Sequence, residues 1–145
     1  LKDDARVIQL KADPHSEALA DWNAANAKFK SVLSSSPTFT VAKKLEYRKG
    51  ALEDVRKAIA LAPDNPDSWA WRSFGARALG IEVQLAKADV PKETLAKWAA
   101  EARGWIDEAV DMAGKRPDLA DQMTNLQRQQ QDLENTLMAK GLPRT

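Results

Sequence analysis

The clearest helical pattern in the chain lies in residues 91–113, which read PKETLAKWAAEARGWIDEAVDMA. Apolar residues recur there at steps of three and four, which is the spacing of one face of an α-helix. They are Leu95, Trp98, Ala102, Trp105, Ala109 and Met112. Charged residues occupy the opposite face. A helix with this pattern packs on the rest of the protein through its apolar face.

Prolines divide the chain at intervals of about 25 residues. They are Pro14, Pro37, Pro66, Pro91 and Pro117. Proline suits the first turn of a helix, because the N–H that it lacks would have no partner there. Between the prolines the apolar residues follow helical spacing and never the alternation of a strand. We therefore predict helices over residues 3–12, 15–34, 37–62, 66–88, 91–113 and 117–140.

Connections of a few residues make neighbouring helices antiparallel. A chain of 145 residues is also the usual size of one domain. We therefore predict a single all-α domain over residues 1–145, built of antiparallel helical hairpins. The hairpins either stack into a short solenoid or form an up-down bundle of five to six helices.

The helix predicted over residues 15–34 carries an apolar stripe with a polar residue at its centre. The stripe consists of Leu19, Trp22, Asn26, Phe29 and Leu33. We expect it to face the core, as apolar stripes on helices usually do. On the same argument, we expect Trp71, Trp98 and Trp105 to be core residues.

Residues 50–65, GALEDVRKAIALAPDN, resemble the second helix of a tetratricopeptide repeat. Small residues stand at Ala51 and Ala58, a larger apolar residue at Val55, and a proline follows at Pro63, as in that family. The resemblance implies a short solenoid of helical hairpins that binds peptides in a groove.

Residues 71–78 are similar to the first helix of the next repeat, where a glycine at Gly75 lets two helices approach closely. The resemblance covers residues 50–79. In the family, the first helix of each pair lines the groove, and asparagines there grip the peptide backbone. The resemblance implies that role for Asn26, or for Asn23 in an alternative register.

The balance of charge excludes several classes of partner. The 22 basic and 21 acidic residues alternate along the chain, so no basic stripe attracts nucleic acid. The apolar runs are too short to span a bilayer, so we expect no membrane insertion. The sequence starts at Leu1 without an initiator Met, so it is either a processed mature protein or an excised fragment, and we expect an exported or periplasmic location.

Residues that carry enzyme chemistry are scarce. His15 is the single histidine and the chain contains no cysteine, so neither a tetrahedral zinc site nor a Ser-His or Cys-His pair is expected. Adjacent acids such as Asp107 and Glu108 point about 100° apart on a helix and do not converge. We therefore predict no catalytic residue, no metal and no cofactor.

Trp69 is the most informative candidate for partner binding. It stands two residues before Trp71, about 200° around the same helix, so the two rings cannot face one neighbour. Trp69 either packs on another helix or belongs to an exposed aromatic patch that binds a partner, with Arg72 and Arg77 beside it to recognise carboxylates.

The last predicted helix offers a surface for self-association. Leu126 and Leu133 flank Gln130 in a heptad pattern, and one polar residue in such a pattern can fix the oligomeric state. The alternative is a capping helix that shields the end of a solenoid.

These observations favour a non-enzymatic protein–protein interaction or scaffold module that binds a peptide or protein partner through a helical groove. One alternative is a helical bundle that binds a small apolar ligand. Another is a structural component that assembles into homo-oligomers through its C-terminal helix.

Overall fold

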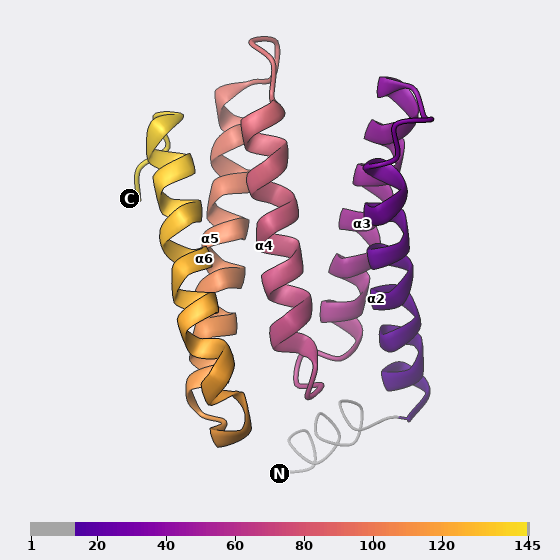
Figure 1. The fold of residues 1–145 in the computed structure, drawn as a ribbon, viewed down its shortest axis with the longest axis vertical. Helices are drawn as coiled ribbons and strands as arrows, with labels where there is room; N and C mark the ends of the chain where they lie inside the picture. Colours follow the sequence, from indigo (N-terminus) through magenta and orange to yellow (C-terminus); the bar gives the residue numbers. More distant parts are fainter. Residues whose placement is uncertain (1–13, 145) are drawn as a thin grey trace, which may run out of the picture. The chain divides into compact units, whose positions relative to one another are not determined.

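The computed structural model describes residues 14–144. In this part of the chain the regular structure is entirely helical (Figure 1). The helices are α2 (Pro14–Ser34), α3 (Val41–Leu61), α4 (Ser68–Leu85), α5 (Lys92–Gly114), the short 3-10 helix η1 (Pro117–Leu119) and α6 (Ala120–Ala139). The all-α class is confirmed. The helix predicted over residues 3–12 lies outside the described residues.

Three of the helices start after the proline that marks them. Helix α3 begins at Val41 because Thr40 is its N-cap, with the hydroxyl accepting a hydrogen bond of 3.1 Å from the Lys43 amide. Pro66 lies in a turn before α4, where the Asn65 side chain accepts a bond of 2.8 Å from the Asp67 amide. Pro91 directly precedes α5. These prolines therefore lie in the loops before the helices, and the helices predicted over residues 37–62 and 66–88 were each five residues too long.

The chain divides into two compact units at Trp71, inside α4. Each unit is described by itself below. That all 145 residues form a single domain stays a prediction.

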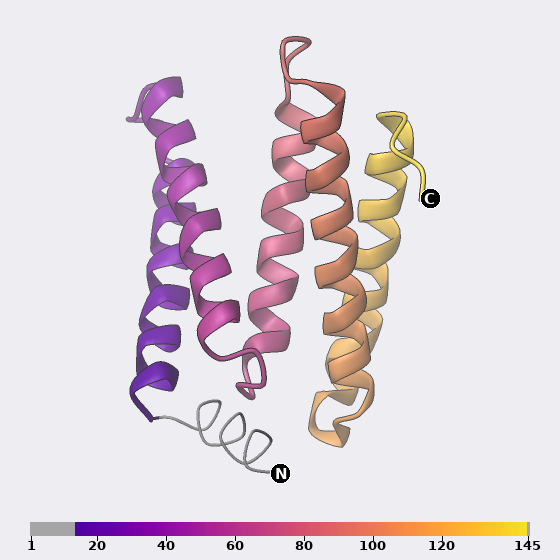
Figure 2. The ribbon, with the colours of Figure 1, turned by 180° about the vertical axis from the view of Figure 1, so that it is seen from behind.

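The first unit is built on an antiparallel hairpin of α2 and α3 (Figures 1 and 2). Its buried apolar residues are mostly alanines, among them Ala20, Ala24 and Ala27 on α2, and Ala51 and Ala58 on α3. Side chains this small let two helices pack closely. Beside them, Lys30 Nζ lies 2.7 Å from the carboxylate of the buried Asp54. The ion pair between Lys30 and Asp54 thus adds to the small apolar contacts between α2 and α3.

The second unit combines α5 and α6 with α4 from Arg72 onward, and α5 runs antiparallel to both other helices (Figure 2). Gly75 of α4 lies against the Trp105 ring of α5, and a Cβ atom at Gly75 would be only 2.6 Å from that ring. The largest fully buried side chains of the second unit include Leu79, Ile106 and Leu137.

Of the other tryptophans predicted to be core residues, Trp71 and Trp105 are buried, and Trp98 is half-buried.

Candidate functional site

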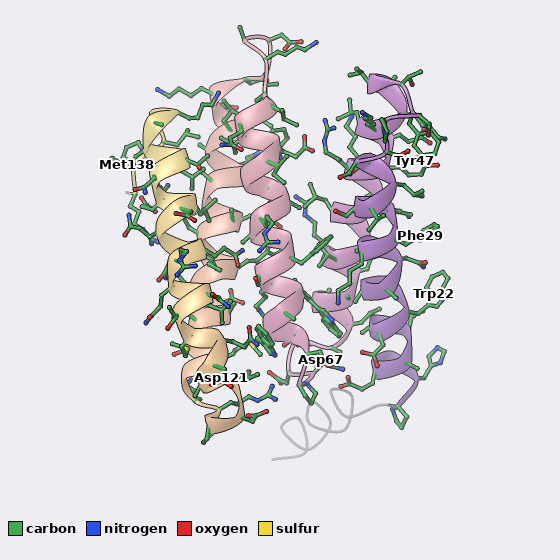
Figure 3. All side chains as sticks on the ribbon, in the orientation of Figure 1. Trp22, Phe29, Tyr47, Asp67, Asp121 and Met138 are labelled. Carbon is green, nitrogen blue, oxygen red and sulfur yellow. The ribbon has the colours of Figure 1, made fainter. Side chains whose placement is uncertain are left out.

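The apolar stripe of α2 does not face the core. Trp22 and Phe29 are each 63% exposed, and both project from α2 away from α3 (Figure 3). The prediction that Trp22 is a core residue is therefore wrong. The face that packs on α3 instead carries Ala20, Ala24 and Ala27. The alanine face packs on α3 because it lets the two helices come closer together than a face with two aromatic rings would.

Helix α2 thus has two apolar faces that point in different directions. Trp22 and Phe29 are seven residues apart, which is about two turns, so both side chains point the same way about 10 Å apart along the axis. Ala24 is two residues from Trp22, about 200° around the helix. The small residues of α2 therefore face α3, while its large apolar residues Trp22 and Phe29 face solvent.

We define the α2 outer stripe as the residues on this outward side. They are Leu19, Trp22, Asn26, Phe29, Val32 and Leu33. Val32 is 72% and Leu19 is 38% exposed, whereas Leu33 is half-buried. The two rings alone expose about 100 to 150 Å² each, since a whole aromatic side chain has 150 to 250 Å². Exposed apolar patches of several hundred Å² on a protein surface are often interaction sites.

Asn26 lies in the middle of the α2 outer stripe, between Trp22 and Phe29. Its side chain is half-buried, and its carboxamide has no hydrogen-bond partner among residues 14–144. Asn23 differs, because it is buried and its amide donates a bond of 2.8 Å to the Leu19 carbonyl one turn earlier. Of the two asparagines considered for partner binding, Asn26 is therefore the one whose carboxamide has no partner in this part of the chain.

The other residues predicted to bind a partner lie on α4. Arg72 is 8% exposed, and its guanidinium donates to the Glu108 carboxylate of α5 and, at 3.4 Å, to Met112 Sδ. Its expected place in an exposed patch is wrong, because Arg72 is committed to packing α4 on α5. Trp69 is half-buried and Arg77 is exposed.

The heptad residues of α6 make their contacts within the second unit. Leu126 and Leu133 are buried on α6, and Gln130 Nε2 donates a bond of 2.7 Å to the Asp107 carboxylate of α5. The polar residue in the heptad thus pairs with α5. Leu126 and Leu133 would therefore reach a second copy only if α6 came away from its neighbours, and the half-buried Gln130 already has a partner on α5.

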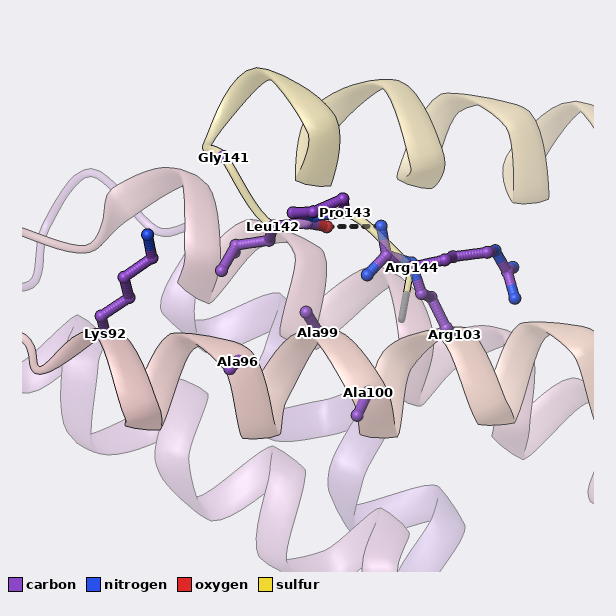
Figure 4. Close-up of a pocket in the computed structure, with 9 residues that line it drawn as sticks. All are labelled: Lys92, Ala96, Ala99, Ala100, Arg103, Gly141, Leu142, Pro143 and Arg144. Atoms are coloured by element: carbon purple, nitrogen blue, oxygen red, sulfur yellow. Dashed lines mark hydrogen bonds between the residues drawn. The ribbon is translucent and has the colours of Figure 1, made fainter.

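A surface hollow of about 520 Å³ lies between the first half of α5 and residues 141–144 (Figure 4). Its alanine wall is formed by Ala96, Ala99 and Ala100. Arg103 beside it donates two bonds of 2.9 and 2.7 Å to the Glu134 carboxylate and one of 2.5 Å to the Leu142 carbonyl. This pairing stabilises the carboxylate and lowers the pKa of Glu134. Arg103 therefore fastens the C-terminal segment to α5.

Arg144 extends this network at the surface. Its guanidinium bonds the Asp107 carboxylate at 3.2 and 3.3 Å and the Glu134 carboxylate at 3.2 Å. The Asp107 carboxylate raises the pKa of Arg144. Two of the three cations that line the hollow, Arg103 and Arg144, are thus paired with acids of the same chain, and Lys92 is the third.

Within residues 14–144, no group of three or more histidine, cysteine or acidic side chains is arranged to hold a metal ion. In the same region, no helix combines the length and the hydropathy needed to cross a bilayer. Of the eight large apolar residues that are exposed in this region, four belong to the α2 outer stripe.

Comparison with known proteins found no matching family model, curated protein or solved structure. The relation to tetratricopeptide repeats stays a prediction.

Proposed function

We propose that this protein is a non-enzymatic protein–protein interaction module that binds a partner polypeptide through the α2 outer stripe. The observation that carries the proposal is the outward position of Trp22 and Phe29 on a well-formed helix whose other apolar face is already packed. At about 25 cal/mol per Å², covering each ring contributes about 3 kcal/mol. No contact with α3 supplies that burial.

The spacing of the stripe favours a helical partner. Leu19, Trp22 and Phe29 follow the steps of three and seven by which one helix packs along another. From residue 19 to residue 33 the stripe is about 21 Å long at 1.5 Å per residue. An amphipathic helix of about 15 residues would cover it, and helix recognition in proteins commonly uses anchors at this spacing.

Trp22 and Phe29 are the expected anchors of the interface. Aromatic residues dominate binding energy when they lie at the centre of a contact, and the surrounding residues mainly exclude water. Here Leu19 and Val32 flank the two rings along the stripe. We expect truncation of either ring to weaken binding by about 2 to 4 kcal/mol.

The experiment is chemical cross-linking in native extract followed by affinity capture, so that weakly bound partners are also retained, with the wild-type chain and with the double variant Trp22→Ala/Phe29→Ala. Leu85→Ala and Met138→Ala are matched controls, since both residues are large, apolar and more than half exposed on other helices. Circular dichroism establishes that each variant folds. We expect the partner to be lost from the double variant and retained by both controls. A partner that the double variant retains at wild-type yield contradicts the proposal.

A further inference from the structure

The α2 outer stripe reads almost the same in both directions. From either end, its central line is leucine, aromatic, asparagine, aromatic, leucine: Leu19, Trp22, Asn26, Phe29 and Leu33. Asn26 stands at the midpoint, seven residues from each leucine. A surface with this order is complementary to a copy of itself that runs the opposite way.

We propose that the helix that covers the α2 outer stripe is α2 of a second copy of this chain, antiparallel to the first and related to it by a two-fold axis at Asn26. This inference rests on the proposed function, and names the partner of the same surface. In a two-fold contact, residue i of one copy meets residue j of the other, and j meets i. Leu19 then lies opposite Leu33 of the second copy, and Leu33 opposite its Leu19.

The aromatic residues fit the same axis. Trp22 is four residues before Asn26 and Phe29 is three residues after it. In an antiparallel pair they are therefore offset by one residue, about 1.5 Å along the helix. Aromatic rings pack well when offset, with centroids 4.5 to 7 Å apart. The contact thus contains two Trp22–Phe29 pairs, one on each side of the axis.

The carboxamide of Asn26 selects this register. A carboxamide both donates and accepts hydrogen bonds, so two of them facing each other across a two-fold axis satisfy each other. Asn26 has no such partner among the described residues of its own chain. A shifted register would place its amide against an aromatic ring, where it would stay unpaired. A single asparagine in an apolar helix contact is known to fix register in this way.

Charge and area set the strength of the contact. The six residues of the α2 outer stripe carry no charge, so two copies meet without repulsion. The stripe exposes about 450 Å² of mostly apolar surface per copy, hence about 900 Å² in a pair, which is the size of a weak and transient interface. We therefore expect a reversible dimer with a dissociation constant of about 100 µM, formed at high local concentration.

A charge-swap experiment tests the position of the axis. By sedimentation equilibrium at about 500 µM, we expect Asn26→Asp and Asn26→Lys each to be monomeric, because like charges face each other across the axis. An equimolar mixture of the two variants should dimerise at least tenfold more tightly than either variant alone. Lys57→Glu, at an exposed residue of α3, is the control and should dimerise like wild type. A mixture as monomeric as its components overturns the two-fold contact at Asn26.

Disulfide trapping tests the direction of the helices. Because the chain contains no cysteine, each introduced thiol is the only one present. Under mild oxidation we expect Asn26→Cys to cross-link with itself, and Leu19→Cys to cross-link with Leu33→Cys in a mixture. Leu19→Cys alone should not cross-link, because in an antiparallel pair its two thiols lie about 21 Å apart, too far for a disulfide. In a parallel pair the two thiols would lie side by side and would cross-link.

The two proposals fail in different ways. A wild-type chain that stays monomeric up to 1 mM, and whose Asn26→Cys variant does not cross-link, overturns the second copy as partner. The proposed function survives that result if Trp22→Ala/Phe29→Ala still loses a captured partner. If the double variant dimerises and captures like wild type, both proposals are wrong.

Discussion

Two helix glycines are expected to respond to the same substitution with opposite signs. Gly75→Ala places a Cβ atom 2.6 Å from two carbons of the Trp105 ring, so this buried ring or one of the two helices has to shift. Overpacking costs about 1 to 3 kcal/mol, and a contact this short belongs in the upper part of that range, while alanine in a helix interior regains about 1 kcal/mol. Gly104→Ala is the control, because a Cβ atom there meets nothing within 4 Å.

Urea denaturation followed by circular dichroism measures both variants. We expect Gly75→Ala to lower the free energy of unfolding by about 1 to 2 kcal/mol and Gly104→Ala to raise it by about 0.5 to 1 kcal/mol. Adding Trp105→Leu should make Gly75→Ala harmless relative to Trp105→Leu alone, since the ring is then gone. If Gly75→Ala is as stabilising as Gly104→Ala, the close contact between α4 and α5 is not present in solution.

Three further predictions concern the helix faces and the C-terminal network. Trp22→Ala should change the free energy of unfolding by no more than about 0.5 kcal/mol, because its ring is mostly solvated; a loss above 2 kcal/mol in urea denaturation would mean that Trp22 is a core residue. Leu133→Ala, by contrast, should lower the free energy of unfolding by about 2 to 4 kcal/mol in the same assay, because it leaves a cavity between α6 and its neighbours. A loss as small as that of the exposed control Met138→Ala would contradict the burial of Leu133. Because Arg103 lowers the pKa of Glu134, that pair stabilises the fold above about pH 4.5, the ordinary value of the carboxyl, and its contribution is lost as the pH falls further through the lowered pKa. Glu134→Gln should therefore be less stable than wild type at pH 7, with a difference that shrinks below pH 4.5, and stability curves that stay parallel from pH 7 to pH 3 would show that the pair contributes nothing.

The helices of this protein could be predicted from local chemistry. Proline before a helix and apolar residues at steps of three and four are properties of a short segment, so α5 was located to within one residue at either end. The start of α3 was missed by four residues because the prediction placed it at Pro37, while the actual cap is the Thr40 hydroxyl. The sequence does contain this start signal, because threonine is a preferred N-cap residue.

The side of a helix that packs was harder to predict. Periodicity shows that a face is apolar, but α2 has two such faces, and the larger side chains of Trp22 and Phe29 suggested the wrong one. The available signal was the small residues at Ala20, Ala24 and Ala27, matched by Ala51 and Ala58 on the next helix. Small residues on both members of a hairpin indicate close packing more directly than aromatic residues on one.

The pairing of charged residues was beyond the reach of the sequence. Arg72 looked like a surface residue because its ion-pair partner, Glu108, is 36 positions away. Such a pair follows only once α4 and α5 are known to pack together. The same holds for Gln130, whose position in the heptad suggested contact with another copy, while Asp107 of the neighbouring helix is its partner.

Fluorine NMR of protein labelled with 5-fluorotryptophan tests the role of Trp22 most directly. Trp22→Phe identifies the Trp22 resonance among the five tryptophan signals. At about 20 µM that resonance should shift between H₂O and D₂O, as an exposed ring does, and it should lose this shift as the concentration approaches 1 mM or captured partner is added. The resonance of buried Trp105 should stay constant throughout. A Trp22 ring that is already shielded at low concentration, or one that stays solvated under every condition, would contradict a binding role for the α2 outer stripe.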